Sequence, residues 1–259
     1  MRSRTVQPGQ VGTARSRRSG GVAATAPPSS SSAASQSFGP VMPVTIPRTV
    51  HAVAVTELPM FPLGAVLLPG EELPLRVFEP RYRQMVEQCL ATDGRFGVVL
   101  IERGSEVGGG DVRTDVGTVA LIDRYVRRPG GEFTLICRGT DRVRIERWLP
   151  DDPYPLAEAE NWPDEVQPAV DLIPLLSRRG EIERLAARLA RSEGGRPRAW
   201  PKLKLPENPV ERSYYLARAL PLSDVDRHRA LAAPGPADRV RVLTEALDDV
   251  IATLRFRLQ

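Results

Sequence analysis

The sequence predicts an α+β protein, in which a mostly antiparallel β domain with one inserted helix is followed by a C-terminal helical bundle. Two patterns predict this class. Short β-like runs separated by Pro and Gly extend from residue 57 to residue 162, and after Pro163 the apolar residues recur at intervals of three or four. The chain of 259 residues is also long enough for more than one apolar core. We therefore expect a leader over 1–54, a β domain over 55–163 and a helical subdomain over 164–259.

The leader is rich in Ser, Ala, Gly, Pro and Arg, and residues 27–32 read P-P-S-S-S-S. Such a segment cannot bury enough apolar surface to offset the loss of chain entropy, so we expect it to be disordered. It carries six arginines and no acidic residue, which leaves 30 basic against 32 acidic groups in the rest of the chain. A basic leader could contact nucleic acid or acidic lipid, but a solvated tail is the simpler interpretation. The slightly acidic remainder argues against a nucleic-acid partner.

The β domain is predicted from runs with strand length and composition, punctuated by turn residues. One helix interrupts them at residues 80–91, where Pro80 suits the first helical position and apolar residues follow at helical spacing. The expected strands cover residues 58–61, 65–68, 73–78, 96–102, 117–126, 133–138, 142–148 and 156–162.

The helical subdomain begins with apolar residues spaced for a helix between Leu172 and Leu189. Asn208 precedes a proline and is expected to cap a helix that runs to Leu220, and Ser223 is expected to cap a helix over 224–232. A last helix over 237–255 carries an apolar face and completes the bundle.

The sequence indicates no metal site, disulfide or cofactor. Cys89 and Cys137 lie in apolar contexts without C-x-x-C spacing, and the two histidines, His51 and His228, are far apart. No apolar run approaches the roughly 20 residues that cross a bilayer, and the N-terminus lacks the apolar segment of a secretory signal. We expect a cytoplasmic protein without a membrane partner.

The most specific motifs are L-P-M-F-P-L-G at 58–64, V-L-L-P-G at 66–70 and L-P-L-R-V-F-E-P-R-Y at 73–82. In order and spacing they resemble the opening of the N-terminal domain of Lon-type ATP-dependent proteases. Later segments are similar to the same domain, namely 94–101, 106–108, 116–120, 220–223 and 238–243. The resemblance covers about residues 56–256.

The resemblance implies a PUA-like β pseudobarrel followed by helices. It also implies a role in recognising unfolded or damaged polypeptides, or in docking on a protease partner. Because PUA-like folds also occur in RNA-modifying proteins, RNA or nucleotide binding stays as an alternative.

The motifs of the Lon catalytic parts are absent from the sequence. It contains no G-x-x-x-x-G-K-[ST] loop, and its only lysines, Lys202 and Lys204, lie in a Pro-flanked segment without a family-like serine motif. The glycines at 108–110 precede a strand rather than a helix, so a flexible connection explains them better than a phosphate site. We therefore expect a free-standing, non-catalytic module without the ATPase and peptidase domains.

Four residues are candidate polypeptide contacts: Met60, Phe61, Leu67 and Trp200. Prolines in the first strands are expected to leave sheet edges accessible near the first three. Phe61 can equally be a core residue, because alternate positions of a strand usually face inward. Trp200 is expected to be partly exposed, whereas Trp148 and Trp162 are expected to be buried anchors between the two subdomains.

Overall fold

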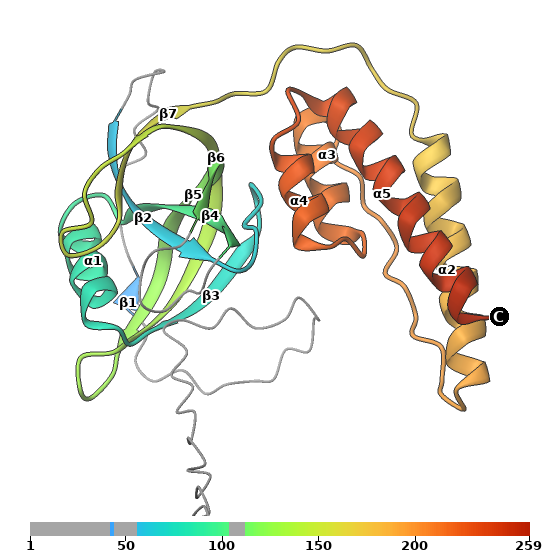
Figure 1. The fold of residues 1–259 in the computed structure, drawn as a ribbon, viewed down its shortest axis with the longest axis horizontal. Coiled ribbons are helices and arrows are strands. Elements are labelled where there is room, and N and C mark those ends of the chain that lie inside the picture. Colours follow the sequence, from blue (N-terminus) through green and yellow to red (C-terminus); the bar gives the residue numbers. More distant parts are fainter. Residues whose placement is uncertain (1–41, 44–55, 104–111) are drawn as a thin grey trace, which may run out of the picture.

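The computed structural model describes residues 42–43, 56–103 and 112–259, and Figure 1 shows a sheet and a group of helices joined by one long connection. The strands are β1 (Met42–Pro43), β2 (Thr56–Leu63), β3 (Glu72–Val77), β4 (Arg95–Arg103), β5 (Val112–Arg127), β6 (Phe133–Trp148) and β7 (Leu156–Asn161). The helices are α1 (Pro80–Ala91), α2 (Ile173–Ser192), α3 (Pro209–Ala219), α4 (Asp224–Leu231) and α5 (Pro236–Arg257). The α+β class is confirmed.

The sheet is mixed, with strand order β1-β5-β4-β2-β7-β6-β3 and a further pairing between β5 and β6. Only β2 and β4 run parallel, and the other pairs are antiparallel. Because β5 and β6 also pair with each other, the pairing path from β5 through β4, β2, β7 and β6 returns to β5. The predicted disordered leader lies outside the described residues, apart from β1, which pairs with Tyr125 and Arg124 of β5.

Two apolar clusters hold the sheet together. The larger one gathers side chains of β2 to β6 against α1, whose Tyr82, Met85, Val86 and Cys89 are buried. The smaller cluster contains residues that alternate along the strands with those of the larger one, including Met60, Val99 and Val119. In β3 the alternation of the sequence is fully expressed, since every second residue is buried.

Two strand predictions need correction. Residues 65–68, predicted as a strand, form a loop, because the amide of Leu68 is bonded to the carboxylate of Glu71 at 3.0 Å instead of to a neighbouring strand. Residues 133–138 and 142–148, predicted as two strands, are one strand. Gly139 continues it while its amide and carbonyl bond to Glu71 and Gly70, each at 2.8 Å.

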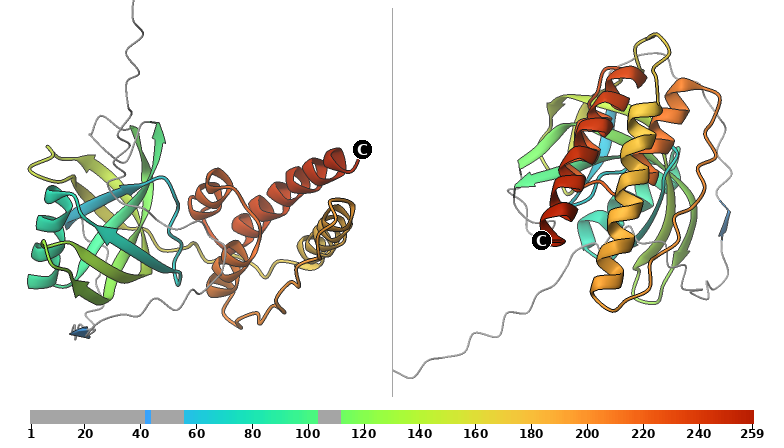
Figure 2. Two further views of the ribbon diagram at one scale, coloured as in Figure 1. Left: turned by 90° about the horizontal axis from the view of Figure 1, so that it is seen from below. Right: turned by 90° about the vertical axis from the view of Figure 1, so that its right-hand side faces the viewer.

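The helices begin where the sequence predicts. The side chain of Asn208 accepts the amides of Val210 and Glu211 at 2.9 and 3.2 Å, and Ser223 accepts the amide of Asp226 at 3.2 Å, as helix caps do. The longest helices, α2 and α5, lie side by side and project from the rest of the molecule, whereas α3 and α4 lie nearer the sheet (Figures 1 and 2). The predicted boundary at 163–164 lies in the connection between β7 and α2.

Candidate functional site: the junction between sheet and helices

The sheet and the helices meet at the loop of residues 64–71, which contributes to both cores. Leu67 packs into the cluster of the sheet, whereas Val66 and Leu68 pack into the cluster of the helices. The buried hydroxyl of Thr118 in β5 donates to the carbonyl of Leu67 at 2.7 Å and fixes the loop on the sheet. Gly139 leaves room for this loop, since a Cβ there would overlap the Leu68 carbonyl. The loop therefore couples the two parts by packing.

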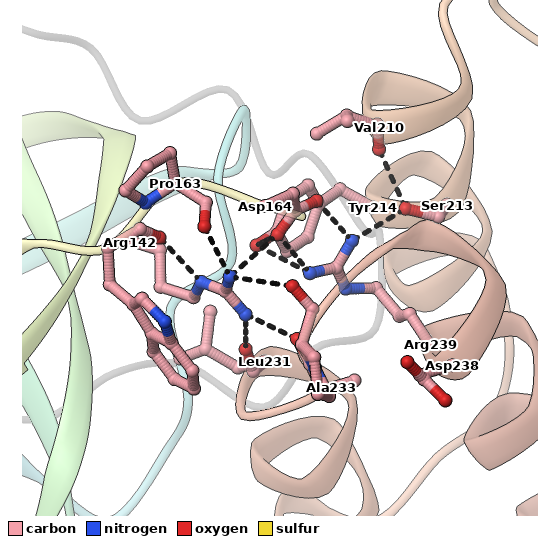
Figure 3. Close-up of polar contacts among 12 residues, drawn as sticks. Arg142, Pro163, Asp164, Val210, Ser213, Tyr214, Leu231, Ala233, Asp238 and Arg239 are labelled. Carbon is pink, nitrogen blue, oxygen red and sulfur yellow. Dashed lines mark hydrogen bonds and ion pairs between the residues drawn. The ribbon is translucent and has the colours of Figure 1, made fainter. Parts of the chain in front are cut away.

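Arg142 of β6 reaches from the sheet to the backbone of the helical part (Figure 3). Its guanidinium donates to the carbonyls of Trp162 at 2.9 Å and Pro163 at 3.2 Å, at the end of the sheet. It also donates to the carbonyls of Leu231 at 2.9 Å and Pro234 at 3.2 Å, and to that of Ala233, at the end of α4 and just after it. One side chain therefore holds two segments that are about 70 residues apart in the sequence.

Asp164 lies between two buried guanidiniums. It contacts Arg142 at 2.9 Å and receives two hydrogen bonds of 2.8 Å from Arg239 of α5, a fork-shaped pairing that suits arginine. All three side chains are at least 96% buried. Arg239 also donates to the hydroxyls of Ser213 and Tyr214, at 2.7 and 2.8 Å, so α3 joins the same network (Figure 3).

Burial shifts the pKa of two groups of this network. It lowers the pKa of Arg142, an effect that Tyr214 and Asp164 oppose, and it raises the pKa of Tyr214 to about 12. The tyrosine is therefore a neutral hydrogen-bonding group at physiological pH. The network combines one carboxylate with two guanidiniums, and a buried charge is stable only while its partners stay in place. Its chemistry is that of a structural clamp.

A second set of bonds holds the loop of residues 64–71 against the helices. Arg227 of α4 donates to the carbonyl of Val66 at 3.0 Å and pairs with Glu71. Asp224, at the start of α4, accepts the amide of Val66 at 3.1 Å, and Arg218 of α3 donates to the carbonyl of Pro69. Together with Arg142 these bonds fix the orientation of the helices on the sheet.

Metal-ligand groups and cysteines were the other candidate chemistry in the described residues. No group of three or more His, Cys, Asp or Glu side chains there could hold a metal ion. Both cysteines are free and buried, and burial raises the pKa of Cys89 to about 12 and also raises that of Cys137, so both thiols stay protonated at physiological pH. None of the described helices could cross a membrane.

Three of the four predicted contact residues require a correction. The side chains of Met60, Phe61 and Leu67 are 0%, 1% and 3% exposed, so they are core residues and cannot reach a partner in this conformation. The strand edge expected near Met60 is also occupied, because this residue pairs with Gly97 and its amide donates to Pro155. The prolines of β2 therefore do not leave an edge open at these positions.

The three tryptophans have different roles. Trp200 is half-buried, as predicted, and packs against the helical cluster with the guanidinium of Arg179 at 5.6 Å from its ring. Trp162 lies at the junction as predicted, with the guanidiniums of Arg142 and Arg144 at 4.0 and 3.8 Å from its ring, but it is half-buried and not buried. The prediction for Trp148 is wrong, because it packs within the sheet cluster and not between the two parts.

His228 of α4 gives the junction a pH dependence that can be measured. Its Nε2 is buried without a hydrogen-bond partner among the described residues, and burial lowers the pKa of the ring below 6.5 despite the opposing effects of Val116, Asp115 and Glu102. The unfolded chain then binds the proton more readily than the folded one. The contribution of the neutral His228 ring to the free energy of unfolding is therefore complete above about pH 6.5 and is lost as the pH falls.

We therefore expect the free energy of unfolding to fall between pH 7.5 and pH 5.5, and to fall less in His228→Gln. Urea titrations followed by circular dichroism at both pH values measure this. Equal pH dependence in the two proteins would contradict a role for His228.

Sequence patterns missed the residues of this junction. Arg239 is the residue that could have revealed the junction. It lies on the apolar face of α5, four residues before Leu243, and a solvated arginine is not expected at such a position. Arg142 and Asp164 gave no such signal, because charged residues are common in strands and loops.

Comparison with known proteins places the chain in a family. A family model described as the substrate-binding domain of ATP-dependent protease La (LON) matches residues 57–249. The Lon N-terminal domain protein from Xanthomonas campestris has a crystal structure with a TM-score of 0.51 and 30% identity, covering 72% of this chain and 96% of that one.

Curated relatives are named Lon proteases, and this chain matches only a small part of their length. Lon protease 2 of Herpetosiphon aurantiacus is 30% identical over 114 residues, which are 43% of this chain and 14% of that protein. The Lon protease of Cytophaga hutchinsonii is 35% identical over 100 residues, covering 38% of this chain and 12% of that protein. The likeness is to the substrate-binding domain and does not include the ATPase or peptidase domains. This chain belongs to the family of Lon substrate-binding domains.

Proposed function

We propose that this protein is a non-catalytic polypeptide-binding module of the cytoplasm, which recognises unfolded or damaged polypeptides or docks on a protease partner. The observation that carries the proposal is the family match over residues 57–249. The two free thiols suit a reducing compartment. We also propose that the sheet is a PUA-like pseudobarrel, which the return of the strand pairing from β6 to β5 supports.

The surface best suited to an apolar polypeptide segment begins in the connection that leaves the junction. Here Val166, Val170, Ile173 and Leu176 are all exposed, and we call these four residues the apolar strip. They follow one another over the end of the connection and the first turn of α2. Exposed apolar groups that recur at short intervals along one segment give an extended polypeptide several apolar contacts.

Trp200 extends this surface. Arg179, three residues after Leu176 on α2, donates to the carbonyl of Pro201 at 2.8 Å and has its guanidinium near the Trp200 ring. Residues three apart on a helix share a face, so the tryptophan lies beside the end of the apolar strip. Its half-exposed ring remains the proposed contact among the four residues that the sequence suggested.

The binding is expected to be weak, because an apolar strip offers a few contacts instead of one enclosed pocket. A dissociation constant of about one micromolar corresponds to roughly 8 kcal/mol, which is in the range of a small interface. Native proteins, whose apolar residues are buried, are expected to bind far less well.

Fluorescence anisotropy tests the proposal with a labelled, reduced and permanently unfolded protein of zero net charge. We expect Ile173→Gln combined with Leu176→Gln to weaken binding about five- to ten-fold, because the two changes together remove apolar contacts worth roughly 1–1.4 kcal/mol. Val225→Gln is the control, since Val225 is about as exposed as Ile173, 65% against 69%, but lies on α4.

The same assay distinguishes polypeptide binding from the alternative function, which is RNA or nucleotide binding. A structured RNA is offered in parallel at two salt concentrations. Polypeptide binding that changes little with salt supports apolar recognition, whereas RNA binding with a steep salt dependence favours a nucleic-acid-binding module. Absence of binding to either ligand, with the fold intact, would direct the search to a folded protease partner.

A further inference from the structure

Basic residues are concentrated in one segment of an otherwise acidic fold. Residues 178–204, which form most of α2 and part of the following loop, hold nine basic against three acidic residues. The rest of residues 55–259 holds 21 basic against 29 acidic residues. Because α2 and α5 project from the molecule, this positive charge lies at one end of it (Figure 2). Such segregation creates a local potential that attracts acidic ligands.

One outward face of α2 carries this charge. Residues at intervals of three or four share a helix face, and the series on this face is Ile173, Ser177, Gly180, Arg184, Arg188 and Arg191. All are exposed except Gly180, where an added Cβ would meet no atom within 4 Å, so this face is open to solvent. The face is apolar at its beginning and basic in its second half.

The three arginines of this face differ from most exposed arginines of the sheet. Arg76, Arg127 and Arg138 are each paired with a carboxylate at 2.6 to 3.0 Å. In contrast, the side chains of Arg184, Arg188 and Arg191 have no ion pair or hydrogen bond within the described part of the chain. Their guanidiniums are therefore available to carboxylates of a ligand, which they can bind through two parallel hydrogen bonds.

A shallow groove between α2 and α5 runs beside the same face. Its volume is about 440 Å³, and Arg184 forms part of its wall with Arg178 and Arg255. These two are held by Asp248 at 2.7 Å and Glu181 at 2.6 Å, in pairs that cross from one helix to the other. The groove thus has a preformed framework and one uncommitted guanidinium.

We propose that this face of α2 docks an extended polypeptide segment in which apolar side chains are followed or preceded by acidic ones. The inference rests on the proposed function and names the class of polypeptide that it favours. The 20 residues of α2 span about 30 Å, the length of roughly nine extended residues. The apolar end of such a segment contacts the apolar strip at Ile173. Its carboxylates contact Arg184, Arg188 and Arg191.

The details of the surface favour a polypeptide over a nucleic acid. Glu181 and Asp248 occupy Arg255 and Arg178 in the groove, so the groove does not offer the continuous row of free cations that a phosphate backbone would follow. Apolar groups flank the charge at both ends, with Ile173 69% exposed and Phe256 of α5 75% exposed. The pair of Arg257 with Glu193, at 2.9 Å, places the end of α5 beside the end of α2. Isolated apolar groups and spaced cations match the side chains of a peptide.

Anisotropy titrations of the whole protein with three labelled probes test this proposal. One is an unstructured peptide of nine to twelve residues that contains Leu and Phe at one end and Asp and Glu at the other. The second is the same peptide with Asn and Gln in place of the acids, and the third is a single-stranded RNA of equal net charge. At low salt we expect the acidic peptide to bind about ten-fold more tightly than the neutral one.

Two triple variants locate the effect. Arg184→Gln, Arg188→Gln and Arg191→Gln together should remove the preference for the acidic peptide, since glutamine preserves the helix and deletes only the charge. Arg76→Gln, Arg124→Gln and Arg127→Gln change the net charge equally on the sheet, at exposed ion pairs of little energetic value, and should preserve the preference. Circular dichroism verifies that both variants are folded.

Each outcome decides a specific point. If the wild type binds the acidic and neutral peptides equally well, the inference is wrong while the proposed function stands. Failure of both peptides to bind would contradict both. RNA binding that is at least as tight, and is lost in the α2 variant, would assign this face to nucleic acid and overturn the inference.

Discussion

Asp164→Asn is expected to lower the free energy of unfolding by about 3–5 kcal/mol, the usual cost of removing one member of a buried ion pair. Asparagine has almost the same shape, so little packing is lost. What changes is the charge, because the guanidiniums of Arg142 and Arg239 would remain buried without a carboxylate. Arginine cannot release its proton to escape this cost. The variant must therefore open the junction or unfold.

Urea unfolding followed by circular dichroism measures the loss. Glu132→Gln is the control, since it removes the carboxylate of the exposed pair with Arg76 and should change stability by less than about 1 kcal/mol. A loss below about 1 kcal/mol for Asp164→Asn would show that water reaches the network and that it does not clamp the junction.

Limited proteolysis separates local opening from global unfolding in the same variant. The connection between β7 and α2 passes the network at Pro163 and Asp164 and carries two of the four residues of the apolar strip. If the junction opens first, cleavage should appear in residues 163–172 at denaturant concentrations where the sheet still gives its native signal. Simultaneous loss of both signals would indicate one cooperative unit.

The elements that the sequence predicted well are those determined by local chemistry. Helix α1 has the predicted bounds because a proline fits its first position and the apolar stripe has a clear period. The caps Asn208 and Ser223 were recognisable because a side chain bonds to backbone only two or three residues away. Such contacts need no knowledge of the tertiary structure.

The junction was not predictable in this way. Residues 65–68 have the composition of a strand. Their backbone groups bond instead to the side chains of Glu71, Thr118 and, in α4, Asp224, and not to a neighbouring strand. Arg142 and Asp164 combine only after the sheet and the helices have packed together. Contacts of this kind leave no periodic trace in one sequence.

The charged face of α2 was also not predicted, because the charges of the whole fold were counted together. The sequence shows a nearly neutral fold when the charges are counted over residues 55–259, and this balance argued against an electrostatic partner surface. The structure shows that most of the opposing charge lies on other elements and that the arginines of α2 lack local partners. Position, and not net charge, determines what a surface attracts.

Phe61→Ala is expected to lower the free energy of unfolding by about 3–5 kcal/mol, as truncation of a buried phenylalanine usually does. The ring is 1% exposed and lies between Tyr82 of α1 and Phe96 of β4, with centroid distances of 4.3 and 6.0 Å. Its removal leaves a cavity where β2 packs on α1, and strand pairing prevents the backbone from closing it. Thermal and urea unfolding measure the loss.

Phe256→Ala is the matched control, because the same atoms are removed from a ring that is 75% exposed at the end of α5, where the change should stay within about 0.5 kcal/mol. The pair also tests the assignment of the binding surface. Under conditions where both variants are folded, Phe61→Ala should bind the neutral unfolded probe as the wild type does. If it is instead stable and unable to bind, then Phe61 is a contact residue, and β2 opens to admit a polypeptide in a way that the packed structure does not show.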